Sequence, residues 1–344
     1  MSEGILRNKN KKVKDYRKAK LFILLFFAVL ISMFLGRYGT KETSIATIIY
    51  DFKNLILGND FLSSSSYVIY NIRLPRIILS ISVGSILSIS GLIFQKVFRN
   101  PIASPDILGI TSGASFGAAL GILIPKVIVG QVQLFAFIFG AIAILAVFKI
   151  RDMSSSDNIL YLVLSGMIVS SFFTAMLSIM KYMADPFEKL PSIVFWTMGG
   201  LYKANWFNAL LIGIIALISI LLIERLSYKI DILSLDDEEA LTLGINVEKM
   251  RKILLISISL IVSLCVCISG TIGWIALIVP HIVKSRFEKT KDIFIMTPIC
   301  GALILLFLDN ISRTMTTSEI PVGILTALIG APILGYFIIF RKVV

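Results

Sequence analysis

Two arginines stand at the start of a long apolar run. Arg73 and Arg76 flank Pro75 in N-I-R-L-P-R-I-I-L-S, and apolar residues then continue to Phe94. Arg313 stands just past a second apolar run, in D-N-I-S-R-T. Arginines usually stand at the cytoplasmic ends of membrane spans. A guanidinium group can also bind lipid headgroups, so these arginines could anchor the chain at the membrane surface.

Residues that could catalyse a reaction or hold a metal are sparse. The single histidine, His281, has no Cys, Asp or Glu beside it in the sequence, so a structural hydrogen bond is favoured over metal ligation. Cys265, Cys267 and Cys300 lie in apolar surroundings, and Cys-x-Cys lacks the spacing of a zinc or redox pair. The sequence contains no G-x-x-x-x-G-K-[ST] loop for a nucleotide. It predicts a protein that is not an enzyme and carries no cofactor.

The segment 234–247 is acidic and has the signals of a short helix. Ser234 is predicted to cap the helix, and the carboxylates of 236–239 suit the positive end of its dipole. Gly244 is predicted to end the helix as its C-terminal cap. A connector in solvent is one interpretation. The alternative is a helix that docks on a soluble partner through Leu241 and Leu243.

Composition places these residues in a membrane protein. The chain has 344 residues, 57% of them hydrophobic and 16% charged, with a mean hydropathy of +0.91. A soluble domain carries roughly 25% charged residues. The net charge of +12 arises from Lys and Arg beside apolar runs, which suits anionic lipid rather than nucleic acid.

Ten apolar runs predict ten transmembrane helices and hence an all-α fold. The stretch 253–283 would be about 46 Å long as one helix, too long for one crossing, and S-G-T-I-G at 269–273 offers a turn that divides it. The eighth run is the shortest. The runs are Leu21–Leu35, Ile77–Phe94, Ile107–Ile124, Val132–Phe148, Ile159–Met180, Trp206–Ile223, Ile253–Ile268, Gly273–Val283, Ile293–Leu308 and Ile320–Phe340.

The distribution of basic residues orients the helices. Residues 1–20 form a basic cytoplasmic segment, and 21–344 form a single transmembrane domain, so ten crossings leave both termini in the cytoplasm. Lys and Arg then divide as 23 inside and 10 outside. The segment 234–247 falls inside, whereas Arg73, Arg76 and Arg313 fall outside, against the usual preference. That exception suggests a function for them.

The interiors of the ten runs contain no Asp, Glu, Lys or Arg. An ion-coupled secondary transporter needs ionisable groups in the membrane, so their absence argues against that class. Small residues instead recur every four positions at Gly109, Gly113, Gly117 and Gly121, and again in 80–88. Such stripes predict close helix packing within the chain, in preference to a substrate-lining surface.

Four stretches together resemble the permease subunit of the ATP-binding-cassette importers for iron-siderophores, haem and cobalamin, the FecCD-type family. The resemblance covers nearly the whole chain after the first apolar run. The stretches, in family order, are R-L-P-R (73–76) with F-R-N-P-I-A-S-P-D-I-L-G-I-T-S-G-A (98–114), F-W-T-M-G-G-L (195–201), A-L-T-L-G-I-N-V (240–247), and G-T-I-G-W-I-A-L-I-V-P-H-I (270–282) with E-I-P-V-G-I-L-T-A-L-I-G-A-P (319–332).

The resemblance implies three interfaces. Arg73, Arg76 and Arg313 would grip carboxylates on the extracytoplasmic substrate-binding protein. A second permease copy, identical or homologous, would enclose the path, mostly between the fifth spans, with a cytoplasmic gate at Ser154, Ser155 and Ser156. A cytoplasmic ATPase, which would bind the ATP, would dock on the coupling helix through Ser234, Asp237, Glu238, Ala240, Leu241, Leu243 and Gly244.

The resemblance also implies a multi-pass permease of the bacterial cell membrane that performs no chemistry itself. We expect a ferric siderophore or a related iron chelate as its cargo, with haem or cobalamin as alternatives. A secondary transporter that works alone is the alternative from another class. A membrane enzyme is disfavoured, because paired carboxylates, a histidine cluster and an activated nucleophile are all missing from the sequence.

Overall fold

The structure is a computed structural model that describes residues 2–36, 64–154, 159–316 and 318–340. These residues form helices joined by short segments, as predicted. The helices are α1 (Ser2–Phe34), α3 (Ser64–Val68), α4 (Leu74–Val97), α5 (Ile110–Leu123), α6 (Gln131–Met153), α7 (Ile159–Met183), α8 (Lys189–Thr197), α9 (Trp206–Ile232), α10 (Asp237–Thr242), α11 (Val247–Ser269), α12 (Ile275–Lys284), α13 (Thr290–Thr314) and α14 (Val322–Phe340), with a π-helical turn η1 (Ile69–Arg73) and a 3₁₀ turn η2 (Pro105–Leu108).

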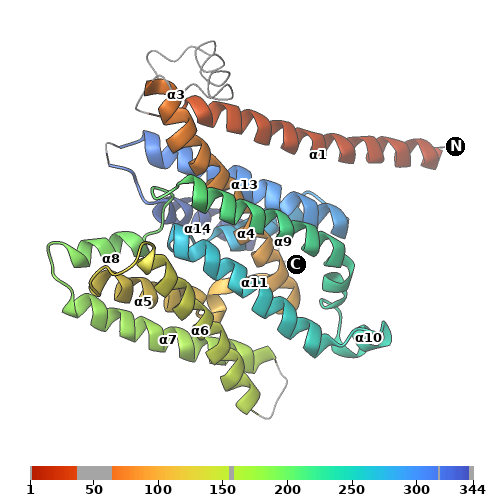
Figure 1. Ribbon diagram of the computed structural model, residues 1–344. Coiled ribbons are helices and arrows are strands. Elements are labelled where there is room, and N and C mark those ends of the chain that lie inside the picture. The colour runs from red at the N-terminus through yellow and green to blue at the C-terminus, as the bar shows by residue number, and fades with distance from the viewer. Residues whose placement is uncertain (1, 37–63, 155–158, 317, 341–344) are drawn as a thin grey trace.

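All ten predicted spans fall on helices of this bundle. Six segments are long and apolar enough to cross a membrane: those centred on α4, α6, α7, α9, α11 and α13. Shorter apolar helices, α5, α12 and the described part of α14, stand at three further predicted spans, and α1 contains the first. Figure 1 places α3 and α8 at one end of the bundle and α10 with the N-terminus at the other. That arrangement agrees with the predicted outer and cytoplasmic sides.

The predicted turn between the seventh and eighth spans is confirmed. Gly270 has a φ of +66° and Trp274 a φ of +69°, so the chain turns between α11 and α12. A Cβ atom at Gly270 would lie 2.4 Å from the carbonyl oxygen of Trp196 in α8. Only glycine fits so close to another backbone in this conformation. α12 itself has ten residues, about 15 Å of helix, or half the thickness of a bilayer core.

A second irregular segment enters the bundle between α4 and α5. There η2 packs against the middle of α7, where a Cβ atom at Gly166 would lie 2.0 Å from the carbonyl oxygen of Ile107. Non-helical backbone is tolerated at membrane depth only where protein or a water-filled cavity surrounds it. Asp106, which directly precedes Ile107 in η2, is exposed.

α4 is the central helix, and small residues bring its neighbours close. A Cβ atom at Gly84 would lie 2.4 Å from the carbonyl oxygen of Gly301 in α13, and Ser88 donates a hydrogen bond to the carbonyl of Thr297 at 3.1 Å. Gly117 of α5 likewise meets the backbone of Phe135 in α6. The predicted small-residue packing within the chain is confirmed.

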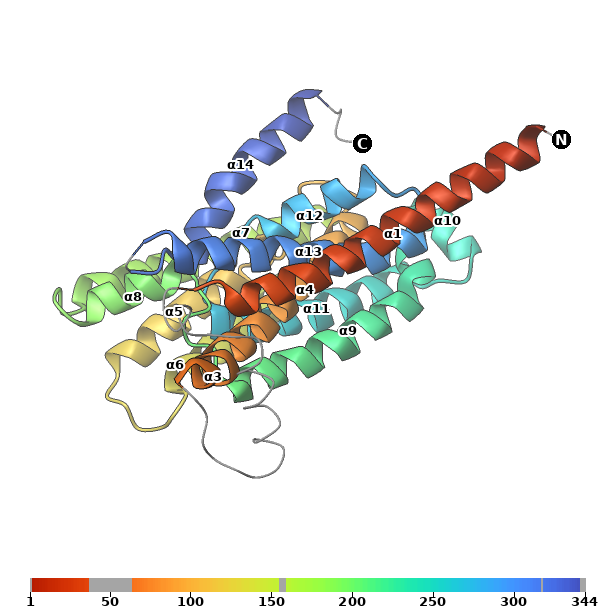
Figure 2. The ribbon, with the colours of Figure 1, turned by 90° about the horizontal axis from the view of Figure 1, so that it is seen from above.

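Three helices remain open on one side. α7 and α9 each have only 28% of their apolar window buried. α7 packs on α5 and α6 and α9 on α4 and α13, so they lie on different sides of the bundle (Figures 1 and 2). Figure 2 shows α14 directed away from the other helices. These open faces are available to lipid or to another chain.

Candidate functional site

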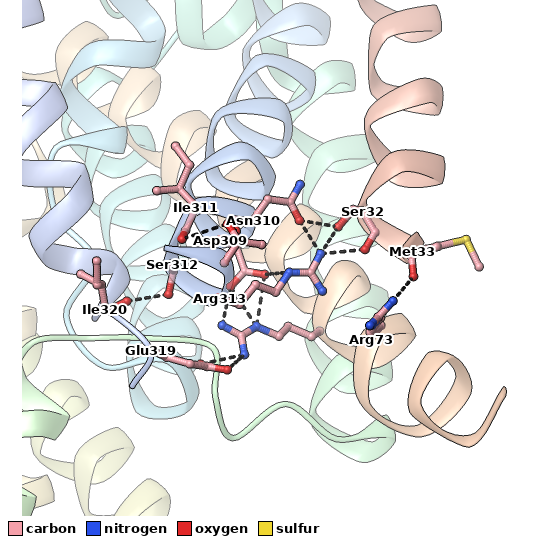
Figure 3. Close-up of polar contacts among 12 residues, drawn as sticks. Ser32, Met33, Arg73, Asp309, Asn310, Ile311, Ser312, Arg313, Glu319 and Ile320 are labelled. Atoms are coloured by element: carbon pink, nitrogen blue, oxygen red, sulfur yellow. Dashed lines mark hydrogen bonds and ion pairs between the residues drawn. The ribbon is translucent and has the colours of Figure 1, made fainter. Parts of the chain in front are cut away.

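The outer arginines lie where α4 and α13 meet. η1 and α4 supply Arg73 and Arg76, whereas Asp309 and Arg313 stand one turn apart on α13. Glu319 lies in the segment before α14 (Figure 3). Both helices extend well past the apolar runs that predicted them, so they carry charged residues at their outer ends.

Arg76 is bound by two carboxylates of its own chain. Its Nε and Nη2 lie 2.9 and 2.8 Å from Oδ1 of Asp309, and its Nη1 lies 2.8 Å from both oxygens of Glu319. The Asp309 side chain is fully buried, whereas that of Glu319 is 40% exposed. Arg76 thus forms a buried pair on one side and a pair open to solvent on the other.

The other two arginines attach α1 to the bundle. Arg313 donates hydrogen bonds to the carbonyl of Ser32, at 2.7 Å, and to the side chain of Asn310. Arg73 donates to the carbonyl of Met33 at 2.8 Å. These contacts satisfy carbonyls near the end of α1 that have no partner within the helix. Figure 3 shows Arg73 beside Met33 and Arg313 beside Ser32 and Asn310, where α1 and α13 meet.

All three arginines are therefore buried, with exposures of 5, 6 and 8% for Arg73, Arg76 and Arg313. Their predicted contact with a binding protein stays a prediction, but the groups that would make it already have partners inside the chain. Sequence reasoning missed Asp309 and Glu319. The spacing of Asp309 and Arg313, four residues apart on a helix, was the signal available for the first of them.

The cytoplasmic segment after α9 contains the predicted short helix, α10. Gly244 has a φ of +78°, and the N–H groups of Gly244 and Ile245 donate to the carbonyls of Leu241 and Ala240 at 2.9 and 3.2 Å. This pair of hydrogen bonds is the Schellman motif. The predicted C-terminal cap is confirmed.

The predicted N-terminal cap is wrong. α10 begins at Asp237 with Asp236 as its N-cap residue, and no side chain caps it. Ser234 lies three residues before the helix and donates to the carbonyl of Asp231 at 2.5 Å. Its hydroxyl satisfies the end of α9 instead, because α9 continues to Ile232, well beyond the apolar run that predicted it.

α10 has one buried residue, Ala240, and its other residues are exposed. Ala240 is fully buried, and Asp237 pairs with Arg99 and, at 3.3 Å, with Arg251. Leu241 and Leu243 are 60% and 52% exposed. Glu238 is also exposed. The helix is thus fixed to the bundle on one side and presents leucines and a carboxylate to the cytoplasm on the other.

The predicted gate lies at the end of α6. Ser154 follows the helix and donates to the carbonyl of Arg151 at 2.7 Å, whereas Ser155 and Ser156 lie outside the described residues. Arg151 is buried and pairs with Glu248 at 3.3 Å. Glu248 stands in the first turn of α11, four residues after Gly244, so the gate residues are linked to the segment that carries α10.

The described residues include no group of three or more His, Cys, Asp or Glu side chains placed to hold a metal ion. In that same part of the chain, Cys265, Cys267 and Cys300 are buried free thiols, in keeping with the packing role expected of them. His281 is buried with 8% exposure beside Phe337, the two ring centroids being 6.1 Å apart.

Comparison with known proteins identifies the family of this chain. Residues 24–340 match the FecCD transport family. The chain is 37% identical to the molybdate import system permease protein MolB of Haemophilus influenzae over 92% of this chain and 94% of that protein. It is 34% identical to a probable iron chelatin transport system permease protein of Helicobacter pylori over 93% and 96%.

A solved structure has the same fold. It is described as an inward-facing conformation of a putative metal-chelate type ABC transporter, and it superimposes with a TM-score of 0.82 at 35% identity. The superposition covers 93% of this chain and 97% of that one. The likeness extends over nearly the whole length of both chains.

Proposed function

This chain belongs to the FecCD transport family and is a membrane permease of an ABC import system; on that premise we propose that it passes an iron chelate, such as a ferric siderophore, into the cytoplasm. The Helicobacter pylori relative and the metal-chelate transporter structure support this cargo. Molybdate is a second candidate, because the Haemophilus influenzae relative is named for it.

An import system of this kind implies an ATPase and a binding protein as partners. We propose that the ATPase docks on the cytoplasmic side of α10. The observation that supports this is the division of α10 into a fixed side, held by Ala240 and Asp237, and an exposed side with Leu241 and Leu243. Exposed leucines next to acidic groups suit a partner groove that has an apolar floor and a basic rim.

Motion of α10 would reach the gate through α11. The ion pair between Arg151 and Glu248 joins the end of α6 to the first turn of α11, and Lys252 pairs with Asp152 at 2.8 Å one turn later. We propose that ATP binding by the ATPase shifts α11 and that these pairs carry the shift to the gate loop. ATP would then change the populations of the inward-open and outward-open states.

The path itself would lie between α7 and a second permease copy. The open face of α7 carries large apolar side chains, with Met167, Ile168 and Phe172 each about 60% exposed. In a single copy of the chain, these side chains would contact lipid. η2, which packs against α7, carries the exposed residue Asp106. A carboxylate is costly in lipid, and a water-filled path between two copies would hydrate it.

At the outer side, we propose that a carboxylate of the binding protein replaces Glu319 on Arg76. Glu319 is the exposed partner of this arginine, and it stands on a short segment before α14. A pair of this kind, open to solvent, contributes little to stability, about 0–1 kcal/mol. Exchange with an incoming carboxylate would therefore be cheap, and Asp309 would keep Arg76 in place throughout.

Uptake of labelled cargo tests the proposed chelate. The permease is reconstituted in proteoliposomes with its ATPase and binding protein, and entry of a ⁵⁵Fe-labelled siderophore is compared with entry of ⁹⁹Mo-labelled molybdate. We expect ATP-dependent entry of the iron chelate that excess unlabelled molybdate does not reduce. Entry of molybdate alone would overturn the proposed cargo and leave the import mechanism intact.

A further inference from the structure

A groove of about 390 Å³ lies at the cytoplasmic end of the bundle, beside α10. α9 and α11 form its two long walls, and the residues that follow α10 close it. Tyr228 and Lys229 contribute from α9, Ile245 from the connection, and Lys249, Met250 and Ile253 from α11. Its size is in the range of pockets that bind small ligands. No site described above includes its two lysines.

The groove is basic and its lysines are available. Lys229 and Lys249 are both exposed, and neither ammonium group has an ion pair within the described residues. Neighbouring cations differ in this respect, since Arg251 is paired with Asp237 and Lys252 with Asp152. No carboxylate lines the groove among the described residues. The site is therefore suited to an anion.

The groove also faces the lipid. The exposed apolar side of α9 includes Ile214, Ile218 and Leu221, and the same side continues in steps of three or four residues to Arg225 and Lys229 at the cytoplasmic end. α9 packs on α4 and α13, on a different side of the bundle from α7 (Figures 1 and 2). A second permease packed on α7 would leave this side of α9 in the bilayer.

An anion that is present at this depth is a lipid headgroup. The cytoplasmic leaflet is anionic, and basic pockets between transmembrane helices on that side bind anionic headgroups. Met250 and Ile253 offer an apolar floor below the lysines, and Tyr228 is an aromatic residue of the kind enriched at the membrane interface. We propose that this groove binds the headgroup of an anionic phospholipid, whose acyl chains lie along α9.

The bound lipid would touch the segment that couples the permease to its ATPase. Leu243 and Gly244 form the end wall of the groove, and they directly follow α10. A lipid in the groove would hold this wall against α9 and α11. This consequence, unlike the binding itself, rests on the proposed docking of the ATPase at α10.

Lipid retention measured by native mass spectrometry tests the binding. The purified permease is titrated with phosphatidylglycerol and with phosphatidylcholine of the same acyl chains. The test variant is Lys229→Gln with Lys249→Gln. The matched control is Lys20→Gln with Lys289→Gln, which removes the same charge from two exposed cytoplasmic lysines outside the groove. Both variants change exposed side chains, and elution as a single detergent-solubilised species confirms that each folds.

We expect the wild type to prefer phosphatidylglycerol and the test variant to bind it about 30-fold more weakly, because each basic residue contributes about 1 kcal/mol at an anionic surface. The control keeps its affinity. Equal losses in the two variants would overturn the proposal, as would equal binding of the two lipids. A Lys229→Cys variant that cross-links to the ATPase in the assembled complex would also overturn it, because the partner would then fill the groove.

Discussion

The pair of Arg76 and Asp309 yields a quantitative prediction. The Asp309 side chain is fully buried, and Nε and Nη2 of Arg76 lie 2.9 and 2.8 Å from its Oδ1. Replacement of one partner leaves the other as an unpaired buried charge, which costs about 3–5 kcal/mol. Arg313 limits the loss, since its Nε lies 3.9 Å from Asp309. We therefore expect Arg76→Met to reduce the free energy of unfolding by about 3 kcal/mol.

The double variant separates the pair from the packing around it. Arg76→Met with Asp309→Leu removes both charges, so it should regain at least half of the stability lost by Arg76→Met alone. Glu319→Gln is the matched control within the same cluster. Because Glu319 is 40% exposed, we expect that change to cost less than about 1 kcal/mol.

Unfolding of the purified permease in mixed SDS micelles, followed by tryptophan fluorescence, gives these free energies. The result that refutes the reasoning is Arg76→Met with wild-type stability. It would mean that the pair with Asp309 does not stabilise the folded chain and that Arg76 serves only to bind the binding protein. A double variant less stable than the sum of its single changes would contradict the pairing as well.

Three further predictions concern single positions. Asp237→Asn removes two ion pairs that fix α10, so it should reduce co-purification of the ATPase severalfold more than the control Asp236→Asn. The Asp236 carboxylate is exposed and lies 3.7 Å from Arg99. Equal effects of the two variants would show that the fixed position of α10 does not matter for ATPase docking. Gly244→Ala should weaken the same co-purification through about 1 kcal/mol of left-handed strain, whereas Gly244→Asn retains it, and an alanine variant as competent as wild type would contradict the cap. Gly166→Val should prevent recovery of folded protein in detergent, because its Cβ atom would lie 2.0 Å from the carbonyl oxygen of Ile107. The control Gly213→Val should be tolerated, because the nearest atom to its Cβ, in Ile78, lies 3.6 Å away. Equal recovery of the two variants would contradict the packing of η2.

The apolar runs predicted the helices well because burial in lipid depends on composition alone. The ends of the helices were predicted poorly. The predicted second span began at Ile77, whereas the helix begins at Ser64, since the polar residues before Pro75 conceal its first turns. The π-helical turn before Pro75 widens the backbone where the proline ring would otherwise meet a carbonyl.

The same errors at the helix ends explain what was missed at the candidate site. The run Ile293–Leu308 stopped one residue before Asp309, so the buried acid that holds Arg76 fell outside the predicted span. Gly244 was assigned correctly, because a left-handed cap demands glycine locally. Ser234 was not, because a serine can satisfy the end of one helix as well as the start of the next. The entry of η2 beside Gly166 depends on tertiary contacts between distant segments.

ATP-driven uptake by the reconstituted system tests the central claim most directly. Proteoliposomes that contain the permease, the ATPase and the binding protein, with no ion gradient, should accumulate the cargo when ATP is present on the ATPase side, and Leu241→Asp with Leu243→Asp should abolish it. Accumulation by the permease alone, driven by an ion gradient without ATP, would contradict the account and favour a secondary transporter.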